Sequence, residues 1–290
     1  MQKIGFIGTG VMGKSMARHI MNAGYDLHIY TRTKAKAEDL LEEGAHWHDS
    51  PADLAREADA VITMVGWPSD VEEVFLNEEG LLRNAREGTL LIDMTTSSPQ
   101  LAEQLAREAE AAGMLILDAP VSGGDTGARN AELAVMCGGE SEAFEKARPL
   151  FEVIGSNIQH LGAAGAGQMT KMANQIAVAG TMMGVSESLA YAQKAGLDVN
   201  QVLETIETGA AGSVSMSRLG RRMLKEDYEP GFYIKHFIKD MRIALESAGN
   251  MELNLPGLEL AESLYTKLSE EGWENAGTQA LIKYYFRKGE

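Results

Sequence analysis

The stretch Lys3-Ile-Gly-Phe-Ile-Gly8-Thr-Gly10-Val-Met-Gly13, at the start of the chain, decides the fold. A short apolar run leads into a Gly-x-Gly-x-x-Gly turn and then a helical pattern, which is the order of a dinucleotide-binding strand, turn and helix. Gly8 allows the tight turn, Gly10 lets a pyrophosphate approach the backbone, and Gly13 lets the helix pack close to the strand. The N–H groups at the helix start then favour phosphate. The alternative is an ordinary flexible turn. The position of the glycine motif between a predicted strand and a predicted helix argues against this alternative.

The composition is that of an acidic globular chain of 290 residues, 44% hydrophobic and 23% charged. Its formal net charge of −16 repels nucleic acid and anionic membranes, so we expect neither as a partner. No apolar run is long enough to cross a bilayer, and the first residues resemble a strand rather than a signal peptide. We therefore expect a cytoplasmic protein. Cys137, the one cysteine, lies in an apolar run and predicts a packing role.

Apolar runs and helical patterns alternate along the first half of the chain. Near-continuous apolar runs are typical of strands that are buried on both faces of a sheet. Strands are predicted at 3–8, 26–31, 60–65, 89–94, 114–119 and 132–138, with helices such as 34–43 and 100–112 between them. This alternation predicts an α/β fold with a doubly wound, mostly parallel sheet of the Rossmann type.

The pattern changes after the small-residue stretch at 162–167. One long helix is predicted from 168 to about 195, and no strand is predicted beyond it. Shorter helices are predicted at 199–207, 214–224, 236–249, 256–271 and 275–287. The sequence thus predicts two domains, a nucleotide-binding domain at 1–163 and an all-α domain at 164–290 joined to it by the long helix.

The end of the second strand bears on the choice of cofactor. In a Rossmann unit an acidic residue at this point binds the ribose 2′-hydroxyl of NAD. Here the strand ends in Thr31-Arg32-Thr33-Lys34, with no carboxylate at the tip. A guanidinium at Arg32 suits a 2′-phosphate, so we favour NADP over NAD. A solvated helix start with incidental basic residues is the alternative.

The segment Asp118-Ala-Pro-Val-Ser122-Gly123-Gly124 follows the fifth predicted strand. It therefore lies at the carboxyl edge of the sheet, where open α/β sheets bind their ligands. A hydroxyl and consecutive backbone N–H groups in such a loop form a concave site that suits a carboxylate. A structural glycine turn is the alternative.

Lys171, Asn174 and Gln175 lie at i, i+3 and i+4 on one face of the long helix. A lysine early in a largely apolar helix is costly to bury without a partner or a task. Burial lowers the pKa of an amine toward neutrality, which suits acid and base catalysis. The alternative is a lysine whose amine reaches water.

The sequence resembles the β-hydroxyacid dehydrogenase family, which includes 3-hydroxyisobutyrate dehydrogenases, tartronate semialdehyde reductases and glyoxylate/succinic semialdehyde reductases. The resemblance covers essentially the whole chain. It rests on the glycine motif that ends at Gly13, on Asp118-Ala-Pro-Val-Ser-Gly-Gly124, on Gly167-x-x-x-Lys171-x-x-Asn174 and on Lys239-Asp240.

The resemblance implies a role for each motif. Lys171 is the implied acid/base, Ser122, Gly123 and Gly124 hold a substrate carboxylate, and Asn174 with Gln175 orients the substrate. The implied cofactor contacts are Gly8, Thr9, Gly10, Val11, Met12, Gly13, Thr31, Arg32, Thr33, Met64, Val65, Thr96 and Lys239. The resemblance implies no metal and a homodimer or homotetramer formed through the helical half.

The sequence departs from the family pattern at two places. Gln175 stands where many members have a second asparagine, and Gly66-Trp67-Pro68 replaces the usual residues after the third predicted strand. The predicted function is the NADP- or NAD-dependent interconversion of a short 3-hydroxy carboxylate, such as 3-hydroxyisobutyrate, with its semialdehyde. An imine reductase and a catalytically silent NADP-binding protein are the alternatives, and Lys171 argues against both.

Overall fold

The computed structural model describes residues 1–286. The chain divides into two compact units, Met1–Lys171 and Met172–Glu290. Helix α9, Ala166–Lys194, contains the division. The domain boundary predicted at residue 163 lies a few residues before this helix and stays a prediction.

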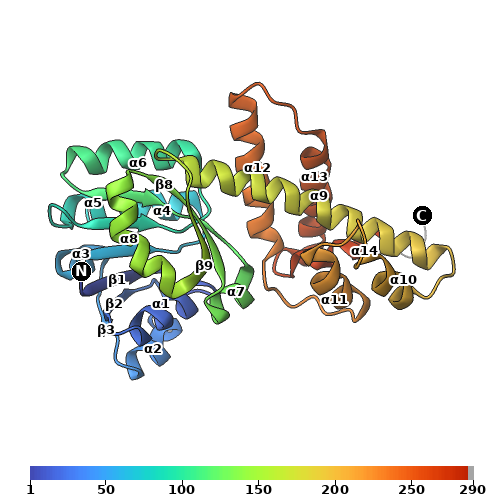
Figure 1. The fold of residues 1–290 in the computed structure, drawn as a ribbon, viewed down its shortest axis with the longest axis horizontal. Helices are drawn as coiled ribbons and strands as arrows, with labels where there is room; N and C mark the ends of the chain where they lie inside the picture. Colours follow the sequence, from blue (N-terminus) through green and yellow to red (C-terminus); the bar gives the residue numbers. More distant parts are fainter. Residues whose placement is uncertain (287–290) are drawn as a thin grey trace. The chain divides into compact units, whose positions relative to one another are not determined.

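The first unit is built on a nine-stranded sheet in the order β3-β2-β1-β4-β5-β6-β8-β7, with β9 paired to β8 (Figure 1). Strands β1 to β6 run parallel, whereas β8 is antiparallel to both β6 and β7. The strands are β1 Lys3–Ile7, β2 Asp26–Tyr30, β3 His46–Trp47, β4 Ala60–Thr63, β5 Leu90–Asp93, β6 Leu115–Asp118, β7 Val121–Ser122, β8 Leu133–Gly139 and β9 Gly155–His160. The mostly parallel sheet predicted from the sequence is confirmed.

Helices cover both faces of this sheet, which is why its central strands are mostly apolar. On β1, Ile4 and Phe6 join one hydrophobic cluster and Ile7 joins another. Helices α1 Gly13–Asn22, α2 Glu38–Glu42, α7 Gly124–Asn130 and α8 Ser141–Ile154 contribute to the first cluster. Helices α3 Pro51–Glu57, α4 Pro68–Leu76, α5 Leu81–Asn84 and α6 Pro99–Ala111 contribute to the second. The predicted helix at 34–43 is a 3-10 turn, Lys34–Ala37, followed by α2.

Three strands were not expected from the sequence. Strands β3 and β7 have two residues each, too short for an alternating pattern to be visible. Strand β9 reads Gly-Ser-Asn-Ile-Gln-His and is largely exposed, so it lacks the apolar residues that reveal a buried strand.

The second unit is helical. It contains most of α9, then α10 Val199–Ile206, α11 Arg221–Leu224, α12 Ile234–Asn250, α13 Pro256–Leu268 and α14 Ile282–Tyr285. Two π-helical segments, Ser215–Gly220 and Ser269–Trp273, and a 3-10 turn, Thr278–Leu281, complete it. Residues 172–286 contain no strand beyond an isolated bridge between Tyr233 and Gly277, so the predicted all-α character is confirmed.

Residues 1–286 contain neither a membrane-spanning helix nor a three-ligand metal cluster. No helix among them is long and apolar enough to span a membrane. No group of three His, Cys, Asp or Glu side chains among them is arranged to hold a metal ion. His46 lies in β3, and His48 follows it with its ring nitrogen 2.7 Å from that of the buried His28. Cys137 is fully buried in β8, and burial raises the pKa of its thiol far above the ordinary value.

Candidate active site

The glycine turn after β1 has the geometry that a dinucleotide requires. Gly8 has a φ of +100°, and a side chain there would collide with the carbonyl oxygen of Met64. A Cβ atom at Gly13 would collide with the carbonyl oxygen of Gly8, so the start of α1 depends on glycine to pack against the turn. Gly10 differs from both because a Cβ atom there would meet nothing within 4 Å. Gly8 and Gly13 thus shape the turn, and Gly10 leaves its outer side open.

The same turn contains a buried side-chain hydroxyl, that of Thr9. Among the described residues, the hydroxyl of Thr9 is buried and has no hydrogen-bond partner. Val11 and Met12 complete the turn, which leads directly into the N-terminus of α1. An open approach at Gly10, a buried hydroxyl beside it and a helix N-terminus behind it fit the pyrophosphate of a dinucleotide.

The tip of β2 presents basic rather than acidic groups. Arg32 is exposed, and its guanidinium lies 2.9 Å from a carboxylate oxygen of Asp70. The Lys34 ammonium lies over the ring of Trp47, 4.9 Å from its centroid. Thr31 and Thr33 flank Arg32 in the sequence, and their contact with a cofactor stays a prediction. The tip therefore presents two cations, with Arg32 oriented by Asp70 and Lys34 by Trp47.

Asp70 is a site residue that the sequence interpretation missed. One of its carboxylate oxygens accepts the backbone N–H groups of Gly66 and Trp67, which caps the start of α4. Its other oxygen pairs with Arg32. The acidic residue shortly after Pro68 is a sequence signal for a helix cap, but its pairing with Arg32 depends on the fold.

The loops after β4 and β5 lie beside the glycine turn. The N–H of Met64 donates to the carbonyl of Ile7 at 2.9 Å, and the N–H of Val65 donates to the Thr95 hydroxyl at 3.0 Å. Thr96 follows Thr95 and is half-buried. The fold therefore brings Met64 and Val65 to Gly8, and the Thr95 hydroxyl links Val65 to the loop that contains Thr96.

The Ser122-Gly123-Gly124 loop lies at the end of β7 and leads into α7. Gly123 and Gly124 have φ values of +135° and +63°, so both need the freedom of glycine. Lys171, from α9, is 7% exposed, and its Nζ donates to the carbonyl oxygen of Val121 at 2.8 Å. The predicted acid/base is therefore buried, and its amine contacts Val121, the residue that precedes the predicted carboxylate loop.

The N-terminus of α9 is fixed by the buried carboxylate of Asp118, at the end of β6. Its two oxygens accept the backbone N–H groups of Gly165 and Gln168, each at 2.8 Å. Burial raises the pKa of Asp118 to about 6, although both hydrogen bonds favour the ionised form. The sequence motif included Asp118 but assigned it no role.

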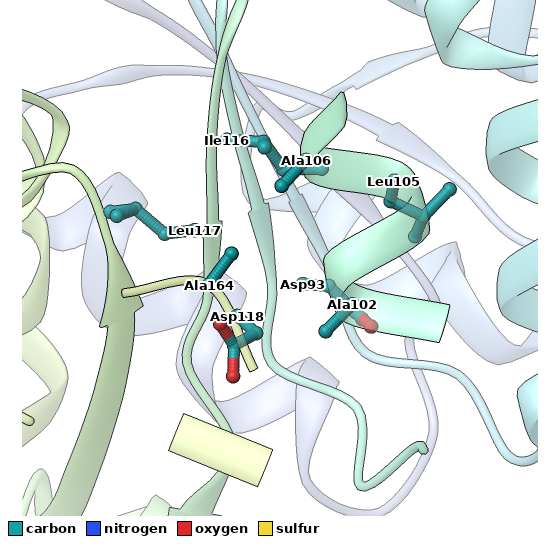
Figure 2. A pocket seen from close by; sticks show the side chains of 8 residues that line it. All are labelled: Asp93, Ala102, Leu105, Ala106, Ile116, Leu117, Asp118 and Ala164. Carbon is teal, nitrogen blue, oxygen red and sulfur yellow. The ribbon is translucent and has the colours of Figure 1, made fainter. Parts of the chain in front are cut away.

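Figure 2 shows a small pocket beside this carboxylate, lined by residues of α6, β5 and β6. Its lining residues are Asp93, Ala102, Leu105, Ala106, Ile116, Leu117, Asp118 and Ala164. Most of them are apolar, so the Asp118 carboxylate is partly surrounded by hydrocarbon, in agreement with its raised pKa.

Three of the predicted site residues lie in the second unit. The Asn174 amide donates to the side-chain oxygen of Gln175 at 2.7 Å, and the Gln175 amide donates to a carboxylate oxygen of Asp240 at 2.6 Å. Lys239 forms an ion pair with Asp240 at 3.1 Å. Gln175 thus links α9 to α12. Its side chain is one methylene longer than that of asparagine, which lets it reach Asp240. The fold brings these residues together within the unit, and their roles toward substrate and cofactor stay predictions.

Comparison with known families covers almost the whole chain. Residues 3–162 match the family described as the NAD binding domain of 6-phosphogluconate dehydrogenase. Residues 165–285 match the family described as NAD-binding of NADP-dependent 3-hydroxyisobutyrate dehydrogenase.

Individual relatives align over nearly their full length. An uncharacterized oxidoreductase of Bacillus subtilis, YkwC, is 58% identical over 98% of this chain and 99% of its own. The 2-hydroxy-3-oxopropionate reductase of Escherichia coli is 38% identical over 97% of this chain and 96% of its own. The structure of 3-hydroxyisobutyrate dehydrogenase from Mycobacterium tuberculosis with L-serine is 30% identical, has a TM-score of 0.89, and covers 99% of this chain and 100% of its own. The chain therefore belongs to the β-hydroxyacid dehydrogenase family of NAD(P)-dependent oxidoreductases.

Proposed function

We propose that this protein interconverts a short 3-hydroxy carboxylate and its semialdehyde, with Lys171 as the acid/base and NADP as the preferred cofactor. The observation that carries the proposal is the buried amine of Lys171, 2.8 Å from the carbonyl of Val121 and beside the Ser122-Gly-Gly loop. A buried amine next to a concave backbone loop suits a substrate that has both a carboxylate and a hydroxyl.

The carboxylate is assigned to the Ser122, Gly123 and Gly124 loop. Two glycines with positive φ let consecutive N–H groups turn toward one point, and the Ser122 hydroxyl adds a further donor. Binding at this loop holds the substrate by its unreactive carboxylate. The reacting hydroxyl or carbonyl group is therefore positioned before the chemical step.

The proton is assigned to Lys171. In the oxidation direction the neutral amine accepts the hydroxyl proton of the substrate as the carbonyl forms. In the reduction direction the ammonium donates this proton to the carbonyl oxygen. The nicotinamide cofactor accepts or supplies the hydride, and the protein supplies orientation and proton transfer. Half-buried Thr96 is assigned to the nicotinamide side of the same site.

The preference for NADP is assigned to the tip of β2. Arg32 keeps 70% of its side chain exposed while paired with Asp70, so its guanidinium has donors available to a 2′-phosphate. Lys34 adds a second cation close by. A homodimer or homotetramer is part of the proposal, and light scattering on the purified protein measures it.

The test follows nicotinamide absorbance with a panel of compounds and with both cofactors. Oxidation is measured with 3-hydroxyisobutyrate, D-glycerate, 4-hydroxybutyrate and L-serine, and reduction with succinic semialdehyde and glyoxylate. We expect turnover that favours NADP(H), with kcat lower by about 10²- to 10⁴-fold in the Lys171→Met variant because the proton transfer is lost.

The matched control is Lys194→Met, which removes an exposed ammonium at the other end of the same helix and should retain wild-type kcat. Carbonyl reduction that survives in Lys171→Met would contradict the assigned mechanism. Turnover of a cyclic imine alone would favour the imine reductase alternative, and cofactor binding without any turnover would favour the silent protein.

A further inference from the structure

We infer that Gln168 is a positioning residue, which fixes the Thr96 loop and the first turn of α9 in one arrangement through its side-chain amide and its backbone N–H. The inference rests on the proposed function for the importance of Thr96 and Lys171, but the arrangement itself can be tested without it. All the groups concerned lie within the first unit.

The side-chain amide of Gln168 binds the backbone on both sides of Thr96. Its Nε2 donates to the carbonyl oxygen of Thr95 at 2.7 Å, and its Oε1 accepts the N–H of Ser97 at 2.9 Å. Thr95 and Ser97 are each 1% exposed, and Gln168 is fully buried. Water cannot replace these bonds without opening the structure, so the amide alone satisfies both backbone groups.

The backbone of Gln168 is held from the other side by Asp118. The carboxylate accepts the N–H groups of Gly165 and Gln168, which are the donors that the first turn of a helix leaves without partners. Lys171 follows Gln168 by three residues and reaches Val121, three residues after Asp118. One loop therefore fixes both the start of the helix and the amine that the helix carries.

Close packing prevents the helix start from adjusting. A Cβ atom at Gly167 would collide with the carbonyl oxygen of Met136 and would come within 2.8 Å of the Asp118 carboxylate. The first turn of α9 is thus pressed against β6 and β8. A change in its orientation must break the bonds of Gln168 to the Thr95–Ser97 segment, the bonds to Asp118, or both.

Glutamine suits this place because its amide donates and accepts at once. A carboxylate of the same shape can accept from Ser97 but repels the carbonyl of Thr95. Methionine fills the same space and does neither. Losing these bonds leaves a buried N–H and a buried carbonyl unsatisfied, which is costly for the ordered loop.

The first test uses the protein without cofactor or substrate. Backbone amide exchange is measured for the segment 93–98 in wild type, Gln168→Met and Asn84→Leu. The control is chosen because the Asn84 amide also donates to two backbone carbonyls, those of Glu78 and Gly80, in the same unit. We expect Gln168→Met to exchange the Ser97 amide about 10-fold faster and Asn84→Leu to leave it unchanged. Unchanged exchange in Gln168→Met overturns the inference, whether or not the protein is an enzyme.

The second test separates chemistry from binding. In Gln168→Met we expect kcat to fall about 10- to 100-fold, because small misplacements of reacting groups have effects of this size. The KM for the cofactor should stay within about twofold, since the glycine turn and Arg32 are untouched. A rise in cofactor KM at unchanged kcat would contradict a positioning role. If the wild type turns over nothing, the proposed function fails while the exchange result still decides the inference.

The Gln168→Glu variant adds a readout that a merely structural role would not produce. A protonated carboxyl donates to Thr95 and accepts from Ser97, as the amide does, but the ionised form only accepts. Its kcat relative to wild type at the same pH should therefore rise as the pH falls. The titratable groups near it are Asp118, Asp93, Glu103 and Lys171, all present in the wild type used for normalisation. A flat ratio across the pH range would count against the hydrogen-bond role.

Discussion

The surroundings of Arg32 and of Gln168 differ in how firmly each side chain is held. Arg32 is 70% exposed and is oriented by one ion pair with Asp70. Gln168 is fully buried and takes part in three hydrogen bonds to two other segments of its unit. Exposed ion pairs contribute little to stability, whereas broken buried bonds leave unsatisfied groups.

This difference separates two tasks within one unit. The residues assigned to cofactor choice lie where a substitution changes binding and little else. The residues assigned to proton transfer depend on a buried network that also holds the fold together. We therefore expect cofactor preference to change by substitution at the β2 tip without loss of turnover, and the network around Asp118 to tolerate little change.

The largest effect should appear when the network is tested through its buried carboxylate. The pKa of Asp118 is raised from 3.8 to about 6, so its protonated form is favoured in the folded protein. The raised pKa stabilises the folded state by about 3 kcal/mol below pH 4, and this contribution is lost as the pH rises through about 6. The unfolding free energy of wild type, relative to that of the Asp118→Asn variant, should therefore fall by about this amount between pH 4 and pH 7.

Urea unfolding followed by tryptophan fluorescence measures this difference, because Trp47 and Trp67 both lie in the first unit. Asp118→Asn also replaces one carboxylate oxygen, a hydrogen-bond acceptor, with an amide nitrogen. This change should lower the unfolding free energy by the same amount at every pH, so it does not affect the pH dependence. A difference that grows with pH would show that the carboxylate is preferentially ionised in the folded state.

A smaller effect is expected at the exposed tip. Arg32→Gln removes the charge assigned to the 2′-phosphate and should raise the KM for NADPH about 10- to 50-fold, while the KM for NADH changes little. The free energy of unfolding should stay within about 0.5 kcal/mol of wild type because the Arg32 side chain is exposed and the Asp70 carboxylate keeps the N–H groups of Gly66 and Trp67. Steady-state kinetics with both cofactors and a urea titration measure the two quantities. If the KM values for NADPH and NADH rose equally, Arg32 would not select the 2′-phosphate, and the contrast between the exposed tip and the buried network would fail.

The smallest effect is expected from Asp70→Asn. The amide oxygen can still accept the N–H groups of Gly66 and Trp67, so the helix cap survives, but the charge opposite Arg32 is lost. We expect the KM for NADPH to change about two- to threefold at unchanged kcat. A 10-fold change would mean that the tip is as firmly organised as the buried network.

The sequence predicts the central part of the fold because its signal is local. Strands such as Ala60–Thr63 and Leu90–Asp93 are apolar runs that both faces of the sheet require, and they are found where expected. Strand Gly155–His160 is polar and gains its place only by pairing with β8. The predicted helix at 214–224 contains a π-helical segment, which depends on packing more than on residue preference.

The candidate site divides in the same way. The glycines, Arg32 and Lys171 can be recognised from short motifs, because their chemistry is visible in neighbouring residues. Gln168 is not recognised, since the backbone groups that its amide binds are 71 and 73 positions earlier in the chain. Asp70 is missed for the same reason, because its pairing with Arg32 requires the ends of two strands to meet.

Helix α9 makes the spacing between Gln168 and Lys171 a fixed quantity. Each residue advances a helix by about 1.5 Å and turns it by about 100°. A single insertion between the two residues would carry the amine away from Val121 while the amide stayed in place, or the reverse. We therefore expect the gene to tolerate an added or lost codon in the turn at 195–196, outside the helix, far better than one between Gln168 and Lys171, where Met169 and Thr170 can be replaced but not changed in number.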